Sequence, residues 1–223
     1  MRIPIVRNVL EANAKEADEL RTYFSRHGIF ALNLISSPGS GKTSLLECTL
    51  QDLGGVLNIA VIEGDLQTDN DARRIAATGA ATVQINTEGG CHLNSHLVAE
   101  ALTRLDLADL DVLFIENVGN LVCPVEFDCG EDAIVAILSV AEGDDKPEKY
   151  PALFERAQVL VINKTDLLPY VAFDLVTAVR HARRLQAGLP VFPVSCTART
   201  GLEAWYDWLR AAVRRKKHCF RMF

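Results

Sequence analysis

One segment limits the fold of this chain more than any other: Ser-Ser-Pro-Gly-Ser-Gly-Lys-Thr at residues 36–43. It follows an apolar run at 30–35 and precedes a helix-forming stretch at 44–47. Small residues between a strand and a helix let successive backbone N–H groups turn toward a phosphate, and the helix N-terminus adds its positive dipole end. The segment therefore predicts a phosphate-binding loop, although Ser36 stands where the first glycine is usual.

The residues of this loop have different predicted roles. Lys42 places a positive charge between the β- and γ-phosphates of a nucleotide, and Thr43 holds Mg²⁺ through its hydroxyl group. The alternative is a glycine-rich turn between a strand and a helix, without a ligand. We expect the nucleotide to contact Gly39, Ser40, Gly41, Lys42, Thr43 and Ser44.

Seven apolar runs alternate with helical patterns along the chain. The runs are mainly continuous rather than alternating in apolar character, which is typical of parallel strands covered on both faces. The runs cover residues 30–35, 57–62, 82–85, 112–115, 134–140, 159–162 and 191–194, and the helical patterns cover residues 8–27, 42–53, 69–78, 94–105, 173–187 and 201–216. A strongly polar stretch at 143–151 is expected to be a loop.

This alternation predicts an α/β fold, namely a P-loop NTPase three-layer sandwich around a mainly parallel sheet of about seven strands. A chain of 223 residues, of which 49% are hydrophobic, can bury one sizeable core. We therefore expect a single P-loop domain over residues 1–223, with residues 1–28 as an N-terminal helix packed on it.

Composition argues against several functional classes. The formal net charge of -6 gives no general attraction to nucleic acid or to an anionic membrane, and the basic run at 214–217 is read as a solvated helix end. No apolar run reaches the length of a membrane span, and the N-terminus lacks a signal-peptide pattern. We expect a cytoplasmic protein with no nucleic acid and no membrane as partner. Its six cysteines are then expected to be thiols or metal ligands rather than disulfides.

Two acidic residues follow apolar runs. Glu116 begins Glu-Asn-Val-Gly, where its carboxylate would hold Mg²⁺ and the Gly119 amide would meet the γ-phosphate; a strand-ending turn is the alternative. Asp65 of Glu-Gly-Asp either contacts the Mg²⁺ shell or orients the attacking water, or else caps the helix that begins at Asp69. The candidate catalytic residues are therefore Lys42, Asp65, Glu116 and Gly119, and the candidate magnesium ligands are Thr43, Asp65 and Glu116.

Asn-Lys-Thr-Asp at 163–166 indicates which base is bound. Asp166 can accept two hydrogen bonds from the N1–H and the exocyclic amine of guanine, while Lys164 lies over the base and Asn163 braces the loop. Adenine lacks this donor pair, and about 1.5–3 kcal/mol for each charged hydrogen bond predicts a preference for guanine on the order of 10²–10⁴-fold. Ser195 and Cys196 are expected to form a further base-contacting loop, although small polar residues also form ordinary turns.

A second group of residues has the composition of a metal site. Cys91 and His92 are adjacent, His96 follows four residues later, and Cys123 lies four residues after Gly119. Thiolate and imidazole together suit Ni²⁺ and Zn²⁺, and His92 and His96 would share one face if a helix began near His92. Structural histidines and cysteines that merely pack are the alternative.

These motifs together resemble a known family. The segments Ser-x-Pro-Gly-Ser-Gly-Lys-Thr at 36–43, Glu-Gly-Asp at 63–65, Gly-Gly-Cys-His-Leu at 89–93, Glu-Asn-Val-Gly-Asn-Leu-Val-Cys-Pro at 116–124, Glu-Gly-Asp-Asp-Lys-Pro at 142–147 and Asn-Lys-Thr-Asp at 163–166 are similar to those of the HypB family of hydrogenase nickel-incorporation GTPases. The resemblance spans nearly the whole chain. The segment at 116–124 is its most specific part, because the related urease accessory GTPase differs there.

The resemblance implies a SIMIBI-class GTPase that hydrolyses GTP with Mg²⁺ and drives nickel insertion into [NiFe]-hydrogenase during its maturation. It also implies a GTP-dependent homodimer with a site for Ni²⁺ or Zn²⁺ shared by two subunits. A nickel-donating or nickel-accepting accessory protein and the hydrogenase large subunit are the implied partners. Cys91, His92 and Cys123 match the motif positions of that metal site, and His96 is a further candidate ligand.

Several alternatives stay open at this point. Lys146 and Lys149 either reach a phosphate across a dimer or are solvated loop lysines. The chain could instead be a zinc-stabilised guanine-nucleotide-binding scaffold whose metal is purely structural. A P-loop kinase acting on a small molecule is a third possibility, and the guanine motif at 163–166 argues against it.

Overall fold

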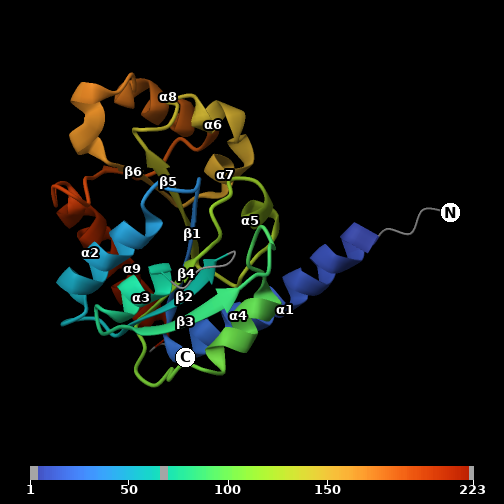
Figure 1. Cartoon of the computed structure of the whole chain (residues 1–223). Coiled ribbons are helices and arrows are strands. Elements are labelled where there is room, and N and C mark those ends of the chain that lie inside the picture. The colour runs from blue at the N-terminus through green and yellow to red at the C-terminus, as the bar shows by residue number, and fades with distance from the viewer. Residues whose placement is uncertain (1–4, 66–69, 221–223) are drawn as a thin grey trace.

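The computed structural model describes residues 5–65 and 70–220, and these form a seven-stranded sheet between helices (Figure 1). The strands are β1 (Phe30–Ser36), β2 (Ile59–Asp65), β3 (Ala81–Asn86), β4 (Val112–Glu116), β5 (Ala133–Ser139), β6 (Val159–Asn163) and β7 (Val191–Pro193). Their order across the sheet is β3-β2-β4-β1-β5-β6-β7, and every pair of neighbours is parallel. The sequence prediction of a mainly parallel sheet of about seven strands is therefore confirmed.

Helices cover both faces of this sheet, which gives the three predicted layers. They are α1 (Ile5–His27), α2 (Lys42–Leu53), α3 (Asn70–Ala76), α4 (Ser95–Leu102), α5 (Cys123–Glu126), α6 (Lys146–Lys149), α7 (Pro151–Arg156), the 3₁₀ helix η1 (Thr165–Tyr170), α8 (Leu175–Leu185) and α9 (Leu202–Phe220). Buried side chains of α2, α3 and α9 pack on one face, and those of α1, α4, α5, α7 and α8 pack on the other. Among the described residues, no helix combines the length and apolar character needed to cross a membrane.

Successive residues of a strand face opposite layers, so each strand contributes to two cores. In β1, Leu32 and Leu34 join the cluster beneath α2 and α9, whereas Ala31 faces α1 and α4. Trp205 of α9 is fully buried, and its indole N–H donates a hydrogen bond to Thr49 Oγ1 of α2 over 3.0 Å. This bond links the C-terminal helix to the helix that follows the phosphate loop.

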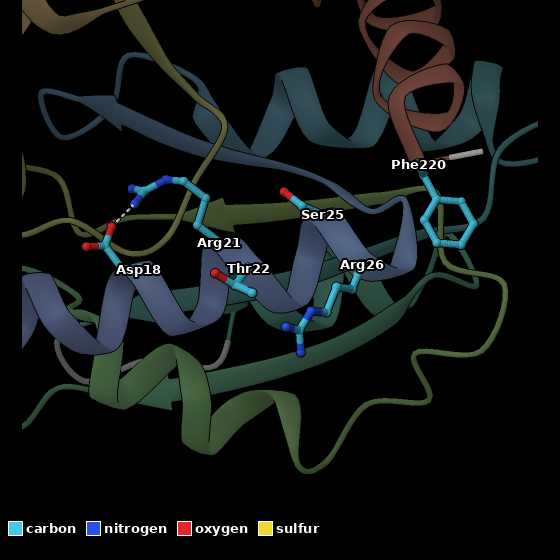
Figure 2. A pocket seen from close by; sticks show the side chains of 6 residues that line it. All are labelled: Asp18, Arg21, Thr22, Ser25, Arg26 and Phe220. Atoms are coloured by element: carbon cyan, nitrogen blue, oxygen red, sulfur yellow. Dashed lines mark hydrogen bonds and ion pairs between the residues drawn. The ribbon is translucent and has the colours of Figure 1, made fainter. Parts of the chain in front are cut away.

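The N-terminal helix α1 packs against α4 and α9, while its first turns project beyond the rest of the molecule (Figure 1). Arg21 of α1 forms ion pairs of 2.6 Å with Asp128 and with Asp18. A hollow of about 700 Å³ lies between α1 and the end of α9, and Figure 2 shows the residues lining it: Asp18, Arg21, Thr22, Ser25, Arg26 and Phe220. None of them belongs to a loop at the carboxyl end of a strand, so this hollow is separate from the site described below.

Two details differ from the sequence prediction or extend beyond the described residues. The polar stretch at 143–151 was expected to be a loop, and that prediction is wrong, because it contains α6 and the first residue of α7. Pro147 and Pro151 stand in the first turn of these helices, where a proline costs no hydrogen bond. The helix expected at 69–78 is α3, but its expected first residue, Asp69, lies outside the described residues.

Candidate functional site

The candidate site is assembled from loops at the carboxyl ends of the strands, which lie along one edge of a parallel sheet. The phosphate loop follows β1, the central strand of the order, and the loop with Cys91 and His92 follows β3. Asp65 ends β2, Glu116 ends β4, and Asn163 ends β6. The topology therefore brings motifs that are far apart in the sequence to one edge.

The phosphate loop turns at two glycines. Gly39 and Gly41 adopt positive φ angles of 75° and 97°, which side chains with a Cβ atom rarely allow. Lys42 begins α2 and is buried, and its Nζ donates to Ser36 Oγ over 3.1 Å. Burial lowers the pKa of Lys42. The hydroxyl of Ser36 thus contacts the lysine that is expected to bind the phosphates, and Ser44 lies further out, where its Oγ accepts from Arg74.

A group of carboxylates lies beside Lys42, and its geometry suits a divalent cation. Thr43 Oγ1 donates to Glu116 Oε1 over 2.7 Å, and Glu63 stands opposite Glu116 in the register of β2 and β4. Burial raises the pKa of Glu116 to about 7, and burial together with the charge of Glu116 raises that of Glu63 to about 8. Within the described part of the chain, Oε2 of each glutamate is buried without a hydrogen-bond partner. Mg²⁺ would satisfy such oxygens, so the residues present fit this ion.

Sequence reasoning did not single out Glu63. Nothing in the order of residues shows that it stands beside Glu116, because the pairing of β2 with β4 is set by the topology of the sheet. Asp65, two residues later, is half-buried, and its backbone carbonyl accepts a hydrogen bond from the N–H of Thr87 over 3.0 Å. The end of β2 is therefore connected to the loop that leads to Cys91.

Gly119 lies directly against the phosphate loop. A Cβ atom at this position would stand 2.9 Å from Cα of Pro38, which is closer than real Cβ contacts, and 3.0 Å from the backbone N of Pro38. A glycine is therefore required for this approach. The loop is also held from the other side, because Ser40 Oγ donates to Glu142 Oε1 over 2.7 Å.

The segment at 163–166 connects the phosphate loop to the predicted base-binding region. Asn163 Nδ2 donates to the carbonyl of Ser40 over 3.0 Å, and Lys164 Nζ donates to that of Gly39 over 2.7 Å. Ser195 Oγ donates to Asp166 Oδ1 over 2.5 Å, which fixes the carboxylate that was expected to contact guanine. The backbone N–H of Cys196 contacts Asn163 Oδ1 at 3.3 Å, and burial raises the pKa of its thiol to about 12.

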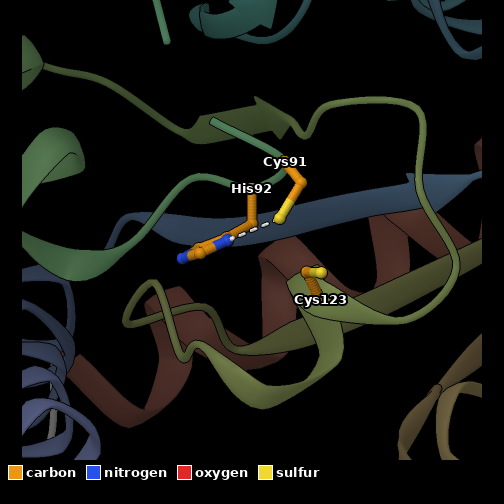
Figure 3. A group of neighbouring side chains, drawn as sticks. All are labelled: Cys91, His92 and Cys123. Carbon is orange, nitrogen blue, oxygen red and sulfur yellow. Dashed lines mark hydrogen bonds between the residues drawn. The ribbon is translucent and has the colours of Figure 1, made fainter. Parts of the chain in front are cut away.

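Cys91, His92 and Cys123 come together in one cluster, which Figure 3 shows. Their ligand atoms all lie within 4.8 Å of one another, and ligand atoms about 2.0–2.3 Å from one ion would lie within about 4.6 Å. His92 Nδ1 stands 3.5 Å from Cys91 Sγ, and the imidazole stacks on Phe127 with ring centroids 3.8 Å apart. A small closing movement would therefore allow all three to bind one Ni²⁺ or Zn²⁺.

The protonation of this cluster has identifiable causes. A hydrogen bond with Cys123 is the largest cause that raises the pKa of Cys91. Burial lowers the pKa of His92, although the charge of Glu126 opposes it. A lowered pKa keeps the imidazole neutral near pH 7, and the neutral ring is the form that binds a metal.

The structure does not bring His96 into this cluster. Asn94 caps α4 by accepting a hydrogen bond from the N–H of Leu97, so the helix begins at Ser95 and His92 lies before it. The premise that His92 and His96 share a helix face is therefore wrong. His96 instead stands 3.3 Å from Glu16 Oε1 of α1, with its side chain 76% exposed.

Lys146 and Lys149 of α6 have partners within their own chain. Lys146 Nζ stands 3.6 Å from Glu142 Oε2, and Lys149 Nζ forms a 2.6 Å ion pair with Asp145. The Lys149 pair is exposed, and such pairs contribute little to stability, so this side chain could be redirected at modest cost. The Lys146 pair is more enclosed, with side chains 23% and 15% exposed.

Comparison with known proteins gives consistent results. Residues 30–193 match the model of the CobW/HypB/UreG nucleotide-binding domain. The chain is 52% identical over 205 residues to the hydrogenase maturation factor HypB of Azotobacter vinelandii. This alignment covers 92% of this chain and 68% of the relative. A crystal structure of HypB from Helicobacter pylori in complex with nickel superposes with a TM-score of 0.87 at 36% identity. The superposition covers 92% of this chain and 96% of the Helicobacter pylori chain. HypB from Archaeoglobus fulgidus superposes with a TM-score of 0.85 at 35% identity, over 91% and 99% of the two chains.

Proposed function

This chain belongs to the hydrogenase maturation factors HypB, within the CobW/HypB/UreG family of nucleotide-binding domains, and from this premise we propose that it hydrolyses GTP to drive nickel insertion into [NiFe]-hydrogenase. Nickel is the cargo in this proposal, and Mg²⁺ accompanies the nucleotide. The nickel complex of the relative from Helicobacter pylori supports the choice of cargo.

One observation carries the proposal: a single segment contacts both candidate sites. Gly119 packs on Pro38 of the phosphate loop, and Cys123, four residues later, faces Cys91 and His92. A γ-phosphate that binds the Gly119 amide would therefore move the segment that ends in Cys123. The metal ligands would then move apart or come together as the bound nucleotide changes. Such a movement would couple hydrolysis to the capture and release of Ni²⁺.

We assign roles to the residues of the nucleotide site, and the geometry supports these assignments. Lys42 would neutralise charge between the β- and γ-phosphates, while Thr43 and Glu116 would hold Mg²⁺, which stabilises the charge that develops on the phosphate oxygens. Asp65, at the end of β2, would orient the attacking water or contact the shell of the ion. Gly39, Ser40, Gly41 and Ser44 would surround the phosphates, and Asn163, Lys164, Asp166, Ser195 and Cys196 would form the guanine site.

The metal cluster offers three ligands, whereas Ni²⁺ and Zn²⁺ usually take four or more. A ligand from a second copy of the chain would fill the remaining coordination position, so that two subunits share the site. Because the nucleotide state moves Cys123, formation of this homodimer would depend on GTP. The same opening would let a nickel-donating or nickel-accepting accessory protein exchange the ion on its way to the hydrogenase large subunit.

The test measures Ni²⁺ and Zn²⁺ binding to the wild type and to Cys123→Ala. Each protein is studied with Mg–GDP and with a non-hydrolysable GTP analogue, while sedimentation reports the molecular mass and phosphate release reports GTP turnover. Cys219→Ala is the matched control, because Cys219 is exposed near the end of α9 and lies outside the cluster. We expect nickel affinity and mass to depend on the nucleotide in the wild type and the control but not in Cys123→Ala. Nucleotide-independent zinc binding to an unchanged monomer would contradict the proposal and favour a structural-metal scaffold.

A further inference from the structure

The loop that carries Cys91 and His92 is held by two asparagine side chains from the segment that contains Gly119. Asn120 Nδ2 donates to the carbonyl of Cys91 over 3.3 Å, and Asn117 Oδ1 accepts from the N–H of Leu93 over 2.9 Å. The first bond is made to the peptide group before His92 and the second to the peptide group after it. We call this pair of side chains the asparagine bracket.

The two arms of the bracket differ in how firmly they are held. Asn117 is fully buried: its Oδ1 also accepts from the N–H of Val118 over 3.0 Å, and its Nδ2 donates to Asn33 Oδ1 of β1 over 3.1 Å. Asn120 is half-buried, and its remaining contact is local, with Oδ1 accepting from the N–H of Val122 over 2.9 Å. Asn117 is thus anchored on the central strand, whereas Asn120 can move with its own segment.

The loop itself has a buried end and an exposed end. Leu93 is fully buried, and a Cβ atom at Gly64 would lie 2.8 Å from its side chain, so the two pack closely. Upstream, Thr87 and Gly90 exchange hydrogen bonds within a turn of their own, and Cys91 is exposed. A pull on the carbonyl of Cys91 would therefore turn Cys91 and His92 about Leu93.

We propose that the asparagine bracket transmits the nucleotide state to the metal cluster, with Asn117 as the pivot and Asn120 as the arm that releases. Both are positioning residues, because neither offers its side chain to the ion or to the nucleotide. This inference rests on the proposed function. It adds that the nucleotide acts on Cys91 and His92 as well as on Cys123, since Gly119 lies between the two asparagines in the sequence.

Asn120→Asp tests the releasing arm with the smallest change. Aspartate keeps the acceptor for the N–H of Val122 but replaces the donor to Cys91 with a second oxygen. Asn120→Ala removes the donor without adding a carboxylate that could itself bind a metal. Asn86→Ala is the matched control, because Asn86 Oδ1 caps the N–H of Glu88 at the start of the same loop and does not contact the bracket.

The experiment compares Ni²⁺ affinity with Mg–GDP and with a non-hydrolysable GTP analogue in each full-length protein. We call the quotient of the two Ni²⁺ affinities, one measured with each nucleotide, the affinity ratio. Allosteric coupling typically amounts to 5- to 150-fold, so we expect an affinity ratio in that range for the wild type and for Asn86→Ala. Both Asn120 variants should bring the ratio below about threefold, and the thiolate-to-nickel absorption band should no longer shift between nucleotides. In metal-free protein, hydrogen exchange of residues 88–94 should depend on the nucleotide in the wild type and not in Asn120→Asp.

The outcomes separate this inference from the function on which it rests. If the wild type shows a ratio and the Asn120 variants keep it, the bracket does not transmit the signal and the inference is overturned, while the proposed function stands. If the wild type itself shows no ratio, the coupling in the proposed function fails and the inference fails with it. Loss of the ratio in Asn86→Ala would also overturn it, because any change in the loop would then have the same effect.

Discussion

At the scale of single residues, we propose that the choice of base depends on one carboxylate. Ser195 holds Oδ1 of Asp166, and the proposed role of this carboxylate is to accept two hydrogen bonds from guanine. Asp166→Asn would replace one acceptor with a donor, so GTP affinity should fall on the order of 10²–10⁴-fold, while xanthosine triphosphate, which offers an acceptor there, should bind better than GTP. Competition against a fluorescent guanine nucleotide measures this change. Asp106→Asn, at an exposed turn, is the control, and an unchanged preference for guanine in Asp166→Asn would contradict the assignment.

A second single-residue prediction concerns pH and stability. Glu131 is buried, accepts from Asn33 Nδ2 and from the N–H of Cys129, and has its pKa raised to about 7, mainly by burial and then by Asp128. The unfolded chain loses this proton near pH 4.5, whereas the native protein keeps it until about pH 7. The stability of the native protein therefore falls as the pH rises between these values.

The side chain introduced by Glu131→Gln cannot ionise, so this variant should not show the loss of stability that Glu131 causes as the pH rises. Relative to the wild type, its free energy of unfolding should increase by about 3 kcal/mol between pH 4 and pH 8. Urea unfolding of both proteins at the two pH values measures the difference. The other raised carboxyl groups, on Glu63 and Glu116, are present in both proteins and cancel in the comparison. If the free energies of unfolding of the variant and the wild type differed by the same amount at both pH values, the prediction would be contradicted.

At the scale of elements, the contact between Gly119 and the phosphate loop leaves no room for an added side chain. In Gly119→Ala the new Cβ would meet the backbone of Pro38, so the segment must move away from the γ-phosphate position. A displacement of this kind should lower single-turnover GTP hydrolysis by about 10²-fold and change GDP affinity by less than about threefold. Gly55→Ala is the control, because no atom lies within 4 Å of its added Cβ. Unchanged hydrolysis, or an equal loss of GDP binding, would contradict this role.

The strands and long helices could be predicted because their signals are local. Most strands coincide with mainly apolar runs, and α2 was predicted with both ends correct because the phosphate-loop motif marks its start. The helices α5, α6 and α7 have four to six residues, too few for a helical period to be visible in the sequence. A proline in the first turn of each was the available signal.

The candidate site shows the same division between local and distant information. Contiguous motifs such as the phosphate loop, or Cys91 followed by His92, could be found as candidates from the sequence. The pairing of Glu63 with Glu116, and the hydrogen bonds from Asn117 and Asn120, join segments that only the sheet topology brings together. Hydrophobic period and sequence motifs do not show where these segments lie relative to one another in space.

At the scale of the whole molecule, a bound nucleotide would bridge both halves of the sheet. Its phosphates would bind beside β1 and β4 and its base beside β6 and β7, so its binding energy is added to the native state of the whole fold. At a concentration 100 times the Kd, mass action stabilises the native state by about 2.7 kcal/mol, which corresponds to a Tm rise of about 5–10 °C for a chain of this size. We expect this rise with Mg–GDP, and we expect it to be independent of protein concentration.

The GTP-bound state should behave differently, because the proposed homodimer adds association to the same equilibrium. With a non-hydrolysable GTP analogue and Ni²⁺, the Tm should rise further as protein concentration increases, since only folded copies associate. Calorimetry over a tenfold or greater range of protein concentration separates the two contributions, and Cys123→Ala should lose the concentration dependence while keeping the rise caused by GDP. A Tm that does not depend on protein concentration with the analogue would show that the nucleotide stabilises a single chain. The shared metal site would then have to be abandoned, whereas the guanine and phosphate assignments would remain.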